Sequence, residues 1–246
     1  MFSTFYHAVF YDPVYNGLVF LIGIVPGGDV GVAVILLTIL VRLVLFPLSL
    51  KAVRTQLIVK KLEPELARIK EQFPNNREEQ AKRTMALHKE NGVNLFSSFL
   101  FTVIQILFIF ALYYIFWRGG LPDIRTNLLY SFISVPEQVR MTLFGILDVA
   151  SKNIFLAAIA GIVQFFQTRL AVPPHPAPLP GAKPSMKNDL ARSFNLQMRY
   201  ALPVLIFVVS YTTSVVVALY LIVSNMVSIG QELYVRATLK RPAPKP

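Results

Sequence analysis

The sequence predicts an all-α polytopic membrane protein: a five-transmembrane-helix bundle with an N-terminal interfacial helix and a cytoplasmic helical hairpin. Of its 246 residues, 54% are of hydrophobic type and 15% are charged, whereas about a quarter of the residues in a typical soluble domain are charged. Several apolar tracts are long enough to cross a bilayer core of roughly 30 Å as helices. The long segment 51–93 is too strongly charged to enter lipid and is expected to lie in water.

Hydropathy and turn-forming residues divide the chain into a series of predicted segments. In order, these are an outer interfacial helix and turn (1–28), a first span (29–50), the charged helical hairpin (51–93), a second span (94–117), an external loop (118–153), a third span (154–170), a cytoplasmic Pro-rich loop (171–199), a fourth span (200–213), a fifth span (214–235) and a basic cytoplasmic tail (236–246). Residues 143–147 are a candidate short interfacial helix within the external loop, and a short polar helix is expected at 189–199.

The N-terminal segment is interpreted as a helix lying in the outer membrane interface. Residues 1–13 are rich in Phe and Tyr, which favour headgroup depth. The apolar run 14–25 is too short to span a bilayer comfortably, and Pro26-Gly27-Gly28 then ends the helix. A short, tilted spanning helix is the alternative interpretation.

The last apolar tract, 200–234, is longer than one span needs, so we predict two short spans joined by a tight turn near 211–214. The positive charges support the same count. Lys and Arg number ten in 51–93, five in 169–199 and four in 235–246, but only four in 118–153 and none in 1–28. By the positive-inside rule the three basic regions are cytoplasmic. Five spans then place the N-terminus outside and the C-terminus inside.

The charged segment has the pattern of two helices separated by a turn. Apolar residues recur at helical spacing up to Phe73, Pro74-Asn75-Asn76 is a turn signal, and a second helix is expected from Arg77 to Glu90. We interpret this hairpin as a docking surface. The alternative is a solvated loop that lies near anionic lipid.

The sequence lacks the constellations that enzymes use. There are no cysteines, and the three histidines fall in different predicted segments, so neither a metal cluster nor a His-based dyad is expected. No phosphate-binding loop, dinucleotide fingerprint or nucleophile elbow is found. We therefore predict a protein that is not an enzyme and needs no metal or cofactor. A small-solute transporter or channel and a structural assembly subunit remain as alternatives, although acidic residues at membrane depth are limited to Asp29 at the edge of the first span.

Arg42 is the one charge well inside the first span. A guanidinium at this depth costs a few kcal/mol or more unless it faces water, a partner or a protein-lined cavity. Together with Gln105 and Gln164 it would line a hydrophilic cavity in the inner half of the bilayer, with Thr38 and Thr102 as further groove candidates. The alternatives are snorkelling of Arg42 to the inner headgroups and ordinary interhelical hydrogen bonding by the other side chains.

Five stretches together resemble the YidC/Oxa/Alb family of membrane protein insertases. The strongest is ILLTILVRLVLFPLSLKAVRTQ, in which an arginine precedes a proline by five residues. The others are KKLEPELARIKEQF, MALHKENGVNLF, VIQILFIFALYY and LYLIVSNMVSIGQELYVR. The resemblance covers roughly residues 14–240, and the combination of the first span with the hairpin is its most specific part.

The resemblance implies an insertase and chaperone that takes hydrophobic segments of nascent proteins through a hydrophilic groove into the bilayer. The groove would be open to the cytoplasm and to lipid, and Arg42 would attract acidic residues in the substrate's extracellular tail. The implied partners are nascent membrane proteins, the ribosome and the lipid bilayer, with the Sec translocon and the signal recognition particle receptor as candidates. The implied location is the bacterial plasma membrane, and no nucleotide or other cofactor is implied.

Overall fold

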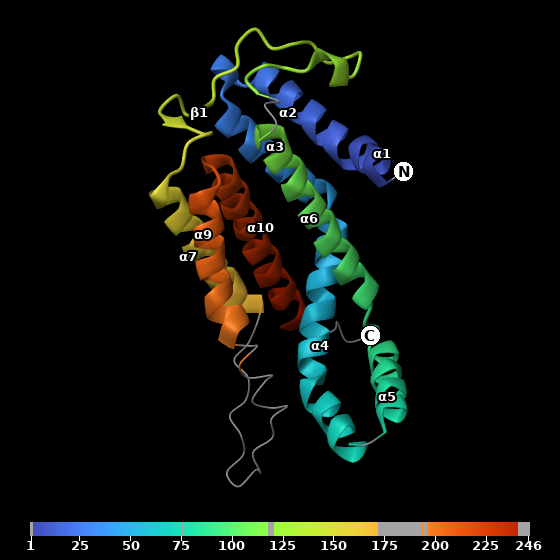
Figure 1. Cartoon of the computed structure of the whole chain (residues 1–246). Coiled ribbons are helices and arrows are strands. Elements are labelled where there is room, and N and C mark those ends of the chain that lie inside the picture. The colour runs from blue at the N-terminus through green and yellow to red at the C-terminus, as the bar shows by residue number, and fades with distance from the viewer. Residues whose placement is uncertain (1, 75, 118–120, 172–192, 194–195, 241–246) are drawn as a thin grey trace. The chain divides into compact units, whose positions relative to one another are not determined.

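The computed structural model describes residues 2–74, 76–117, 121–171, 193 and 196–240, and these are predominantly helical (Figure 1). The elements in chain order are α1 (Phe2–Tyr6), a π-helical turn (His7–Tyr11), α2 (Asp12–Ile24), a 3-10 turn (Pro26–Gly28), α3 (Val30–Val44), α4 (Phe46–Gln72), α5 (Arg77–Glu90), α6 (Leu95–Trp117), a 3-10 turn (Thr126–Leu128), β1 (Thr142–Leu143), β2 (Leu147–Asp148), α7 (Ile154–Ala171), a π-helical turn (Gln197–Ala201), α9 (Leu202–Thr212) and α10 (Val215–Lys240). The predicted all-α polytopic class is confirmed. Most of the polar helix predicted at 189–199 and the end of the basic tail lie outside the described residues.

The chain forms two compact units, which we describe separately. The bundle unit contains Met1–Leu43 and Ile106–Gly230, and the hairpin unit contains Val44–Gln105 and Gln231–Pro246. The first part of α6 and the end of α10 therefore belong to the hairpin unit, and the rest of both helices belongs to the bundle unit.

Within the described residues, three helices are long and apolar enough to cross a membrane: Phe99–Trp117, Ile154–Ala171 and Val215–Thr238. A fourth span results if α3 and α4 are counted as one broken helix. Helix α9 has only 11 residues, which is roughly 16 Å of helix. The five-span count therefore stays a prediction.

The predicted first span, 29–50, is interrupted at Leu45 between α3 and α4. Pro47 lies in the first turn of α4. Its ring has no N–H and clashes with the carbonyl four residues earlier, so a helix cannot run through this position without bending. The sequence contained this signal, because proline is tolerated at the start of a helix and breaks its interior.

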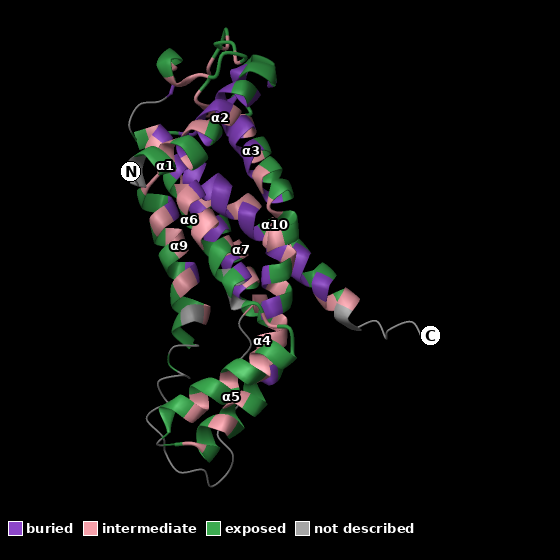
Figure 2. Ribbon diagram, turned by 90° about the vertical axis from the view of Figure 1, so that its right-hand side faces the viewer, coloured by how far each residue is buried: buried purple, intermediate pink, exposed green. Residues whose placement is uncertain are grey.

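The core of the bundle unit is built from regularly spaced apolar residues. On the N-terminal helix, Tyr11, Tyr15, Leu18 and Ile22 recur every three or four residues and are almost completely buried. Figure 2 shows buried residues along α2 and α3. The spacing of the four residues places them on one helix face. The opposite face exposes further apolar residues, namely Phe5, Val9, Phe20 and Ile24. A helix with two apolar faces can pack on protein and contact lipid, so the interfacial placement stays a prediction with this support.

Helices α7 and α9 pack closely through small residues. Ala157, Ala160 and Gly161 of α7 are buried. A Cβ at Gly161 would lie 3.1 Å from Cβ of Phe207 and 3.3 Å from the carbonyl oxygen of Pro203 on α9. Small residues that let helix backbones approach are typical of membrane helix interfaces.

The external loop contains a β-hairpin where a short helix was a candidate. Strands β1 and β2 pair antiparallel, and the N–H of Ile146 donates to the carbonyl of Leu143 at 3.1 Å. The turn residues Phe144 and Gly145 have φ of 54° and 71°. A right-handed helix requires negative φ, so the expectation of a helix at 143–147 is wrong.

The same loop caps the start of α3. The N–H of Val30 donates to the carbonyl of Arg140 at 3.0 Å, and the N–H of Arg140 donates to the carbonyl of Gly28 at 2.9 Å. The carboxylate of Asp29 accepts from the N–H of Val32 at 2.9 Å, which is the N-cap interaction, and from the N–H of Gly145 at 3.0 Å. Asp29 thus joins the hairpin turn to the first turn of α3.

The start of α10 is capped by the end of the loop. Val215 N–H donates to the carbonyl of Ser151 at 3.0 Å, and Val216 N–H donates to the carbonyl of Val149 at 3.3 Å. Helix α7 begins immediately afterwards, at Ile154. The starts of α3, α7 and α10 are therefore held at one end of the bundle unit, which favours α9 as a crossing helix that returns the chain to that end.

Candidate functional site

Arg42 lies in the last turn of α3 and is buried, with 4% of its surface exposed. Its Nε donates to the hydroxyl oxygen of Ser224 on α10 at 2.9 Å, and its Nη2 donates to the same oxygen. Ser224 itself has no exposed surface. One buried hydroxyl therefore fixes the orientation of the guanidinium group.

The next residue of α10 continues the polar contacts to a third helix. Asn225 Nδ2 donates to Oε1 of Gln164 on α7 at 2.8 Å. Gln164 Nε2 in turn donates to the hydroxyl of Thr168 at 2.9 Å and to Oε1 of Gln167 at 3.1 Å. Successive residues of a helix point about 100° apart, so Ser224 and Asn225 can meet α3 and α7 respectively.

We call Arg42, Ser224, Asn225, Gln164 and Thr168 the polar network. Each of its members is buried, and they come from α3, α7 and α10 of the bundle unit. A polar group without a hydrogen-bond partner is energetically unfavourable in a bilayer core, because lipid tails supply no partner. The amide and hydroxyl contacts of the polar network provide these partners.

The electrostatic character of this region is positive. The segments 30–44, 106–117, 154–171 and 202–230, which supply the membrane helices of the bundle unit, contain no Asp or Glu. The Ser224 hydroxyl gives the guanidinium of Arg42 a hydrogen-bond partner without cancelling its charge. Since the effective dielectric constant falls from about 80 in water to about 20 near buried sites, the charge acts more strongly than it would in solution.

The predicted site residues fall into two groups. Arg42, Gln164 and Thr38 belong to the bundle unit, and the structure brings the first two into one network through α10. Thr38 is buried, and its hydroxyl donates to the carbonyl of Val34 at 2.7 Å within α3. Thr102 and Gln105 belong to the hairpin unit, where Thr102 is exposed and Gln105 is half-buried. Their groove role stays a prediction.

Ser224 and Asn225 are not among the site residues predicted from the sequence. The available signal was an adjacent pair of polar side chains in the otherwise apolar stretch 215–227. To select Ser224 and Asn225 as site residues, one must know which helices each face of α10 contacts. The periodicity of polar residues within one span does not contain this information.

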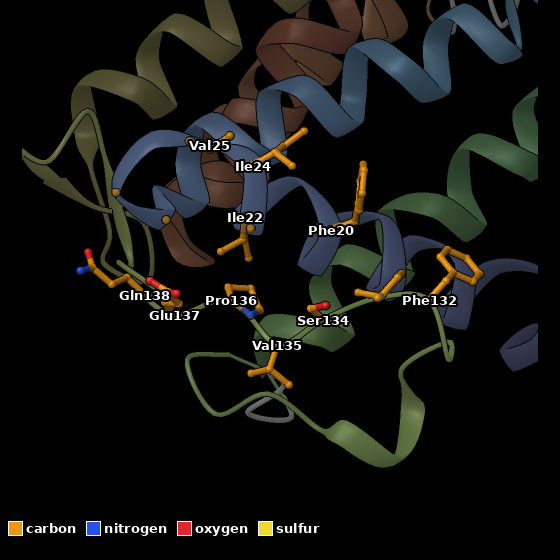
Figure 3. Close-up of a pocket in the computed structure, with 14 residues that line it drawn as sticks. Phe20, Ile22, Ile24, Val25, Phe132, Ser134, Val135, Pro136, Glu137 and Gln138 are labelled. Carbon is orange, nitrogen blue, oxygen red and sulfur yellow. The ribbon is translucent and has the colours of Figure 1, made fainter.

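Among the residues that the structure describes, the bundle unit is hollowed at the end of α2 and again between α7 and α10. The first hollow, of about 590 Å³, is formed by the end of α2 and residues 132–138, with Phe20, Ile24, Phe132 and Glu137 among its lining residues (Figure 3). None of the predicted site residues lines it. The second, of about 640 Å³, lies between α7 and α10. It is lined by Val163, Phe166, Arg169, Leu170, Met226 and Ile229.

The second hollow adjoins the polar network in sequence. Val163 and Met226, which line it, are the chain neighbours of Gln164 and Asn225. Its lining is apolar apart from Arg169 in the last turn of α7. An apolar surface thus lies next to buried polar groups on the same two helices.

The hairpin unit holds its charges on exposed helices. Helix α5 has no buried residue, and Arg83 pairs with Glu79 one turn earlier at 2.8 Å on its surface. Asn76 caps the helix by accepting the N–H of Glu79 at 3.0 Å. On α4, burial lowers the pKa of Lys60, and the nearby positive charge of Arg236 lowers this pKa further.

These features define a class: a polytopic helical membrane protein with a cation buried in its bundle and a charged helical hairpin. A family model described as "60Kd inner membrane protein" matches residues 21–242. The chain belongs to this family, the YidC/Oxa family, as the sequence resemblance predicts.

Several bacterial relatives carry the name membrane protein insertase YidC. The Fusobacterium nucleatum protein is 27% identical over 211 residues, which cover 85% of this chain and 86% of that protein. The Clostridium tetani protein is 25% identical over 209 residues, covering 85% and 82% of the two chains. The Clostridium perfringens protein is 39% identical over 99 residues, covering 40% and 41%.

Proposed function

We propose that this chain is a membrane protein insertase and chaperone that transfers hydrophobic segments of nascent proteins into the bilayer. Membership of the family and the names of its relatives support the general role. The observation that carries the mechanism is the burial of Arg42 against Ser224 in a bundle whose membrane helices contain no Asp or Glu.

Arg42 acts in this proposal by attracting the acidic tail of a substrate. Two opposite charges 4 Å apart attract by about 1 kcal/mol in water and by about 4 kcal/mol at an effective dielectric constant of 20. A carboxylate that leaves water for the inner half of the bilayer would recover part of its desolvation cost next to this arginine. A cytoplasm-open groove that includes Thr38, Thr102, Gln105 and Gln164 would shorten the remaining apolar path.

The hollow between α7 and α10 supports the second part of the proposal. It offers an apolar surface beside the polar network. A hydrophobic substrate segment could lie along this surface while its polar tail is near Arg42. The substrate would then leave sideways into lipid, since no chemical step is required.

The hairpin and the basic tail are proposed to meet the ribosome and, as candidates, the Sec translocon and the signal recognition particle receptor. The ten Lys and Arg residues of 51–93 provide a surface for polyanions, and such binding needs no sequence readout. In this arrangement the hairpin, the Pro-rich loop and the C-terminus are cytoplasmic and the N-terminus is outside, in the plasma membrane of a bacterium.

The test is complementation of an insertase-depleted strain by Arg42→Lys, Arg42→Gln and Arg42→Ala variants. Insertion is scored for one single-span substrate with either an acidic or a neutral N-terminal tail. We expect the Arg42→Lys variant to insert the substrate with the acidic tail. The Arg42→Gln and Arg42→Ala variants should insert it about tenfold less, the equivalent of 1.4 kcal/mol. The neutral substrate is expected to change much less.

Arg140→Gln is the matched control, because it removes one positive charge from an exposed side chain of the external loop. Protein level and thermal stability are measured for every variant, since Arg42→Ala also leaves Ser224 without this partner. Equal insertion of both substrates by Arg42→Ala and by the parent chain would refute the role of the charge. Uptake or conductance in the absence of substrate insertion would favour the transporter alternative.

A further inference from the structure

The tip of the β-hairpin, Phe144-Gly145-Ile146, exposes two large apolar side chains. Phe144 is 70% exposed and Ile146 is 88% exposed. Tight turns in contact with water are normally formed by Gly, Asn, Asp and Ser. An exposed Phe and Ile on either side of a glycine therefore need an explanation other than turn chemistry.

The backbone at the tip adds a second unusual feature. Phe144 has a φ of 54°, and positive φ is uncommon for bulky residues because the Cβ then crowds the backbone. Asn or Gly would form the same turn at lower cost. An unfavourable residue kept at a strained position is a reason to look for a function of its side chain.

Hydrogen bonds fix the position of the tip relative to the ends of membrane helices. Gly145 N–H donates to the carboxylate of Asp29, the residue that precedes α3, at 3.0 Å. At the base of the hairpin, the carbonyl of Val149 accepts from Val216 at the start of α10 at 3.3 Å. The tip is thus held at the level where α3 and α10 begin.

Packing restricts the hairpin further. A Cβ at Gly31, in the first turn of α3, would lie 2.9 Å from the Cα of Leu143 in β1. Direct backbone contact of this kind leaves the hairpin little freedom to move along α3. In Figure 1 the hairpin extends sideways from the helices near the start of α7.

The first residues of α7 have the same character as the tip. Ile154 and Phe155 are 54% and 77% exposed, and they start a helix that is long and apolar enough to span the membrane. Exposed apolar side chains at the end of a helix that can span a bilayer are expected to contact lipid. The tip lies only eight residues before Ile154, so the same lipid surface is within its reach.

We propose that the hairpin tip is a membrane anchor. Phe144 and Ile146 insert between the phospholipid headgroups of the leaflet at which α3, α7 and α10 begin, and they reach the upper part of the acyl chains. The anchor fixes the height of the loop that caps these helices. This inference depends on the polytopic fold and is independent of the insertase function.

The test uses tryptophan fluorescence of the full chain in phospholipid nanodiscs. Trp117 is the single native tryptophan and is replaced in a Trp117→Phe background. Phe144→Trp and Ile146→Trp are then made separately. Quenching is measured with nitroxide-labelled phosphatidylcholine, labelled either near the headgroup or near the chain end, and with iodide in the buffer.

We expect blue-shifted emission, no effect of iodide, and a loss of about half the intensity with the shallow lipid label, because interfacial side chains lie roughly 5–10 Å deep. The deep label is expected to quench less. Ile146→Trp keeps the test valid if the strained position 144 does not accept Trp. Met85→Trp on the charged helix α5, where Met85 is 72% exposed, is the control and should be quenched by iodide.

Two results would overturn the proposal. Emission at the wavelength of hydrated tryptophan, with strong quenching by iodide, would mean that the tip lies in water. Protection from iodide without quenching by either lipid label would mean that the tip is buried against a second copy of the chain or another protein.

Discussion

In the bundle unit, Arg42 is buried and donates to the neutral hydroxyl of Ser224 on α10, whereas residues 51–93, which lie in the hairpin unit, carry ten Lys and Arg on largely exposed helices. The two units also differ in what stabilises them. A cluster of buried apolar residues and a capping loop hold the bundle together, while α5 buries no residue, is capped by Asn76 and has the surface ion pair Arg83–Glu79.

The comparison shows that the burial of a positive charge determines which groups it can interact with. An exposed cation interacts with any anion nearby, and salt screens it over about 10 Å at 0.1 M ionic strength. A buried cation is screened less and acts on a group only if that group enters its site. The hairpin unit is therefore suited to broad electrostatic contact, and the polar network of the bundle unit is suited to one oriented interaction.

The largest difference between the units is expected from two glycines with the same backbone conformation. Gly28 and Gly92 both have φ of 64°, but a Cβ at Gly28 would lie 2.0 Å from the carbonyl oxygen of Gln138, and a Cβ at Gly92 would contact nothing within 4 Å. We expect Gly28→Ala to destabilise the bundle by at least about 3 kcal/mol and Gly92→Ala by about 1–2 kcal/mol.

Thermal unfolding of each variant in detergent measures the difference in stability. Hydrogen exchange of the loop 138–153 shows whether this loop has loosened. Gly92→Ala serves as the control for the backbone cost alone. Equal destabilisation by the two substitutions would show that the loop does not pack on the start of α3 as described.

A double-mutant cycle on Gln164 and Asn225 sharpens the comparison within the bundle. Either single change to Leu leaves one buried amide without its partner across α7 and α10, at a cost of about 1–2 kcal/mol. The double change removes both amides and is expected to cost less than the sum. Ser210→Ala is the control, because this buried hydroxyl has no hydrogen-bond partner among the described residues. Strict additivity would contradict the contact between Gln164 and Asn225.

In the hairpin unit, the expected effects are local. Asn76→Ala removes the N-cap of α5 and should cost about 1 kcal/mol. Hydrogen exchange of residues 77–82 should accelerate while amides of the bundle core stay protected. Asn91→Ala, at the other end of α5, is the control that should leave the first turn unchanged. Faster exchange throughout the bundle would disprove the separation into two units.

The smallest effect is expected from the surface ion pair of α5. Glu79→Gln removes the i,i+4 partner of Arg83, whose side chain is 61% exposed, so the change should cost at most about 0.5 kcal/mol. This cost is measured by comparing the salt dependence of helix stability in the parent chain and in the Glu79→Gln variant. A loss of 2 kcal/mol or more would place this pair in a buried setting and remove the contrast between the units.

The sequence predicts elements well where local chemistry determines them. The helix 77–90 follows a turn signal and an Asn cap, and the structure has α5 over the same residues. The interruption between α9 and α10 lies at Thr213 and Ser214, within the predicted turn. Length, hydropathy and capping residues carry this information, and all three can be read along one chain.

Features that depend on contacts between distant segments could not be predicted in this way. The hairpin at 142–148 is held by Asp29, more than one hundred residues earlier, and its Phe-Gly turn lacks the usual Asn-Gly signal. Similarly, Gln164 was predicted from its depth, but its partner Asn225 was not, because the facing of α10 is a property of the packed bundle.

The most direct test of the central claim is the insertion rate of purified chain in proteoliposomes for substrates with zero, one or two acidic residues in the tail. The parent and Arg42→Lys are predicted to insert the acidic substrates faster than Arg42→Gln does, with a gap that widens with each acidic residue. This gap should be only weakly sensitive to salt, because a buried charge is screened less than an exposed one. Rates that do not depend on the residue at position 42, or a gap that disappears at moderate salt, would contradict the account.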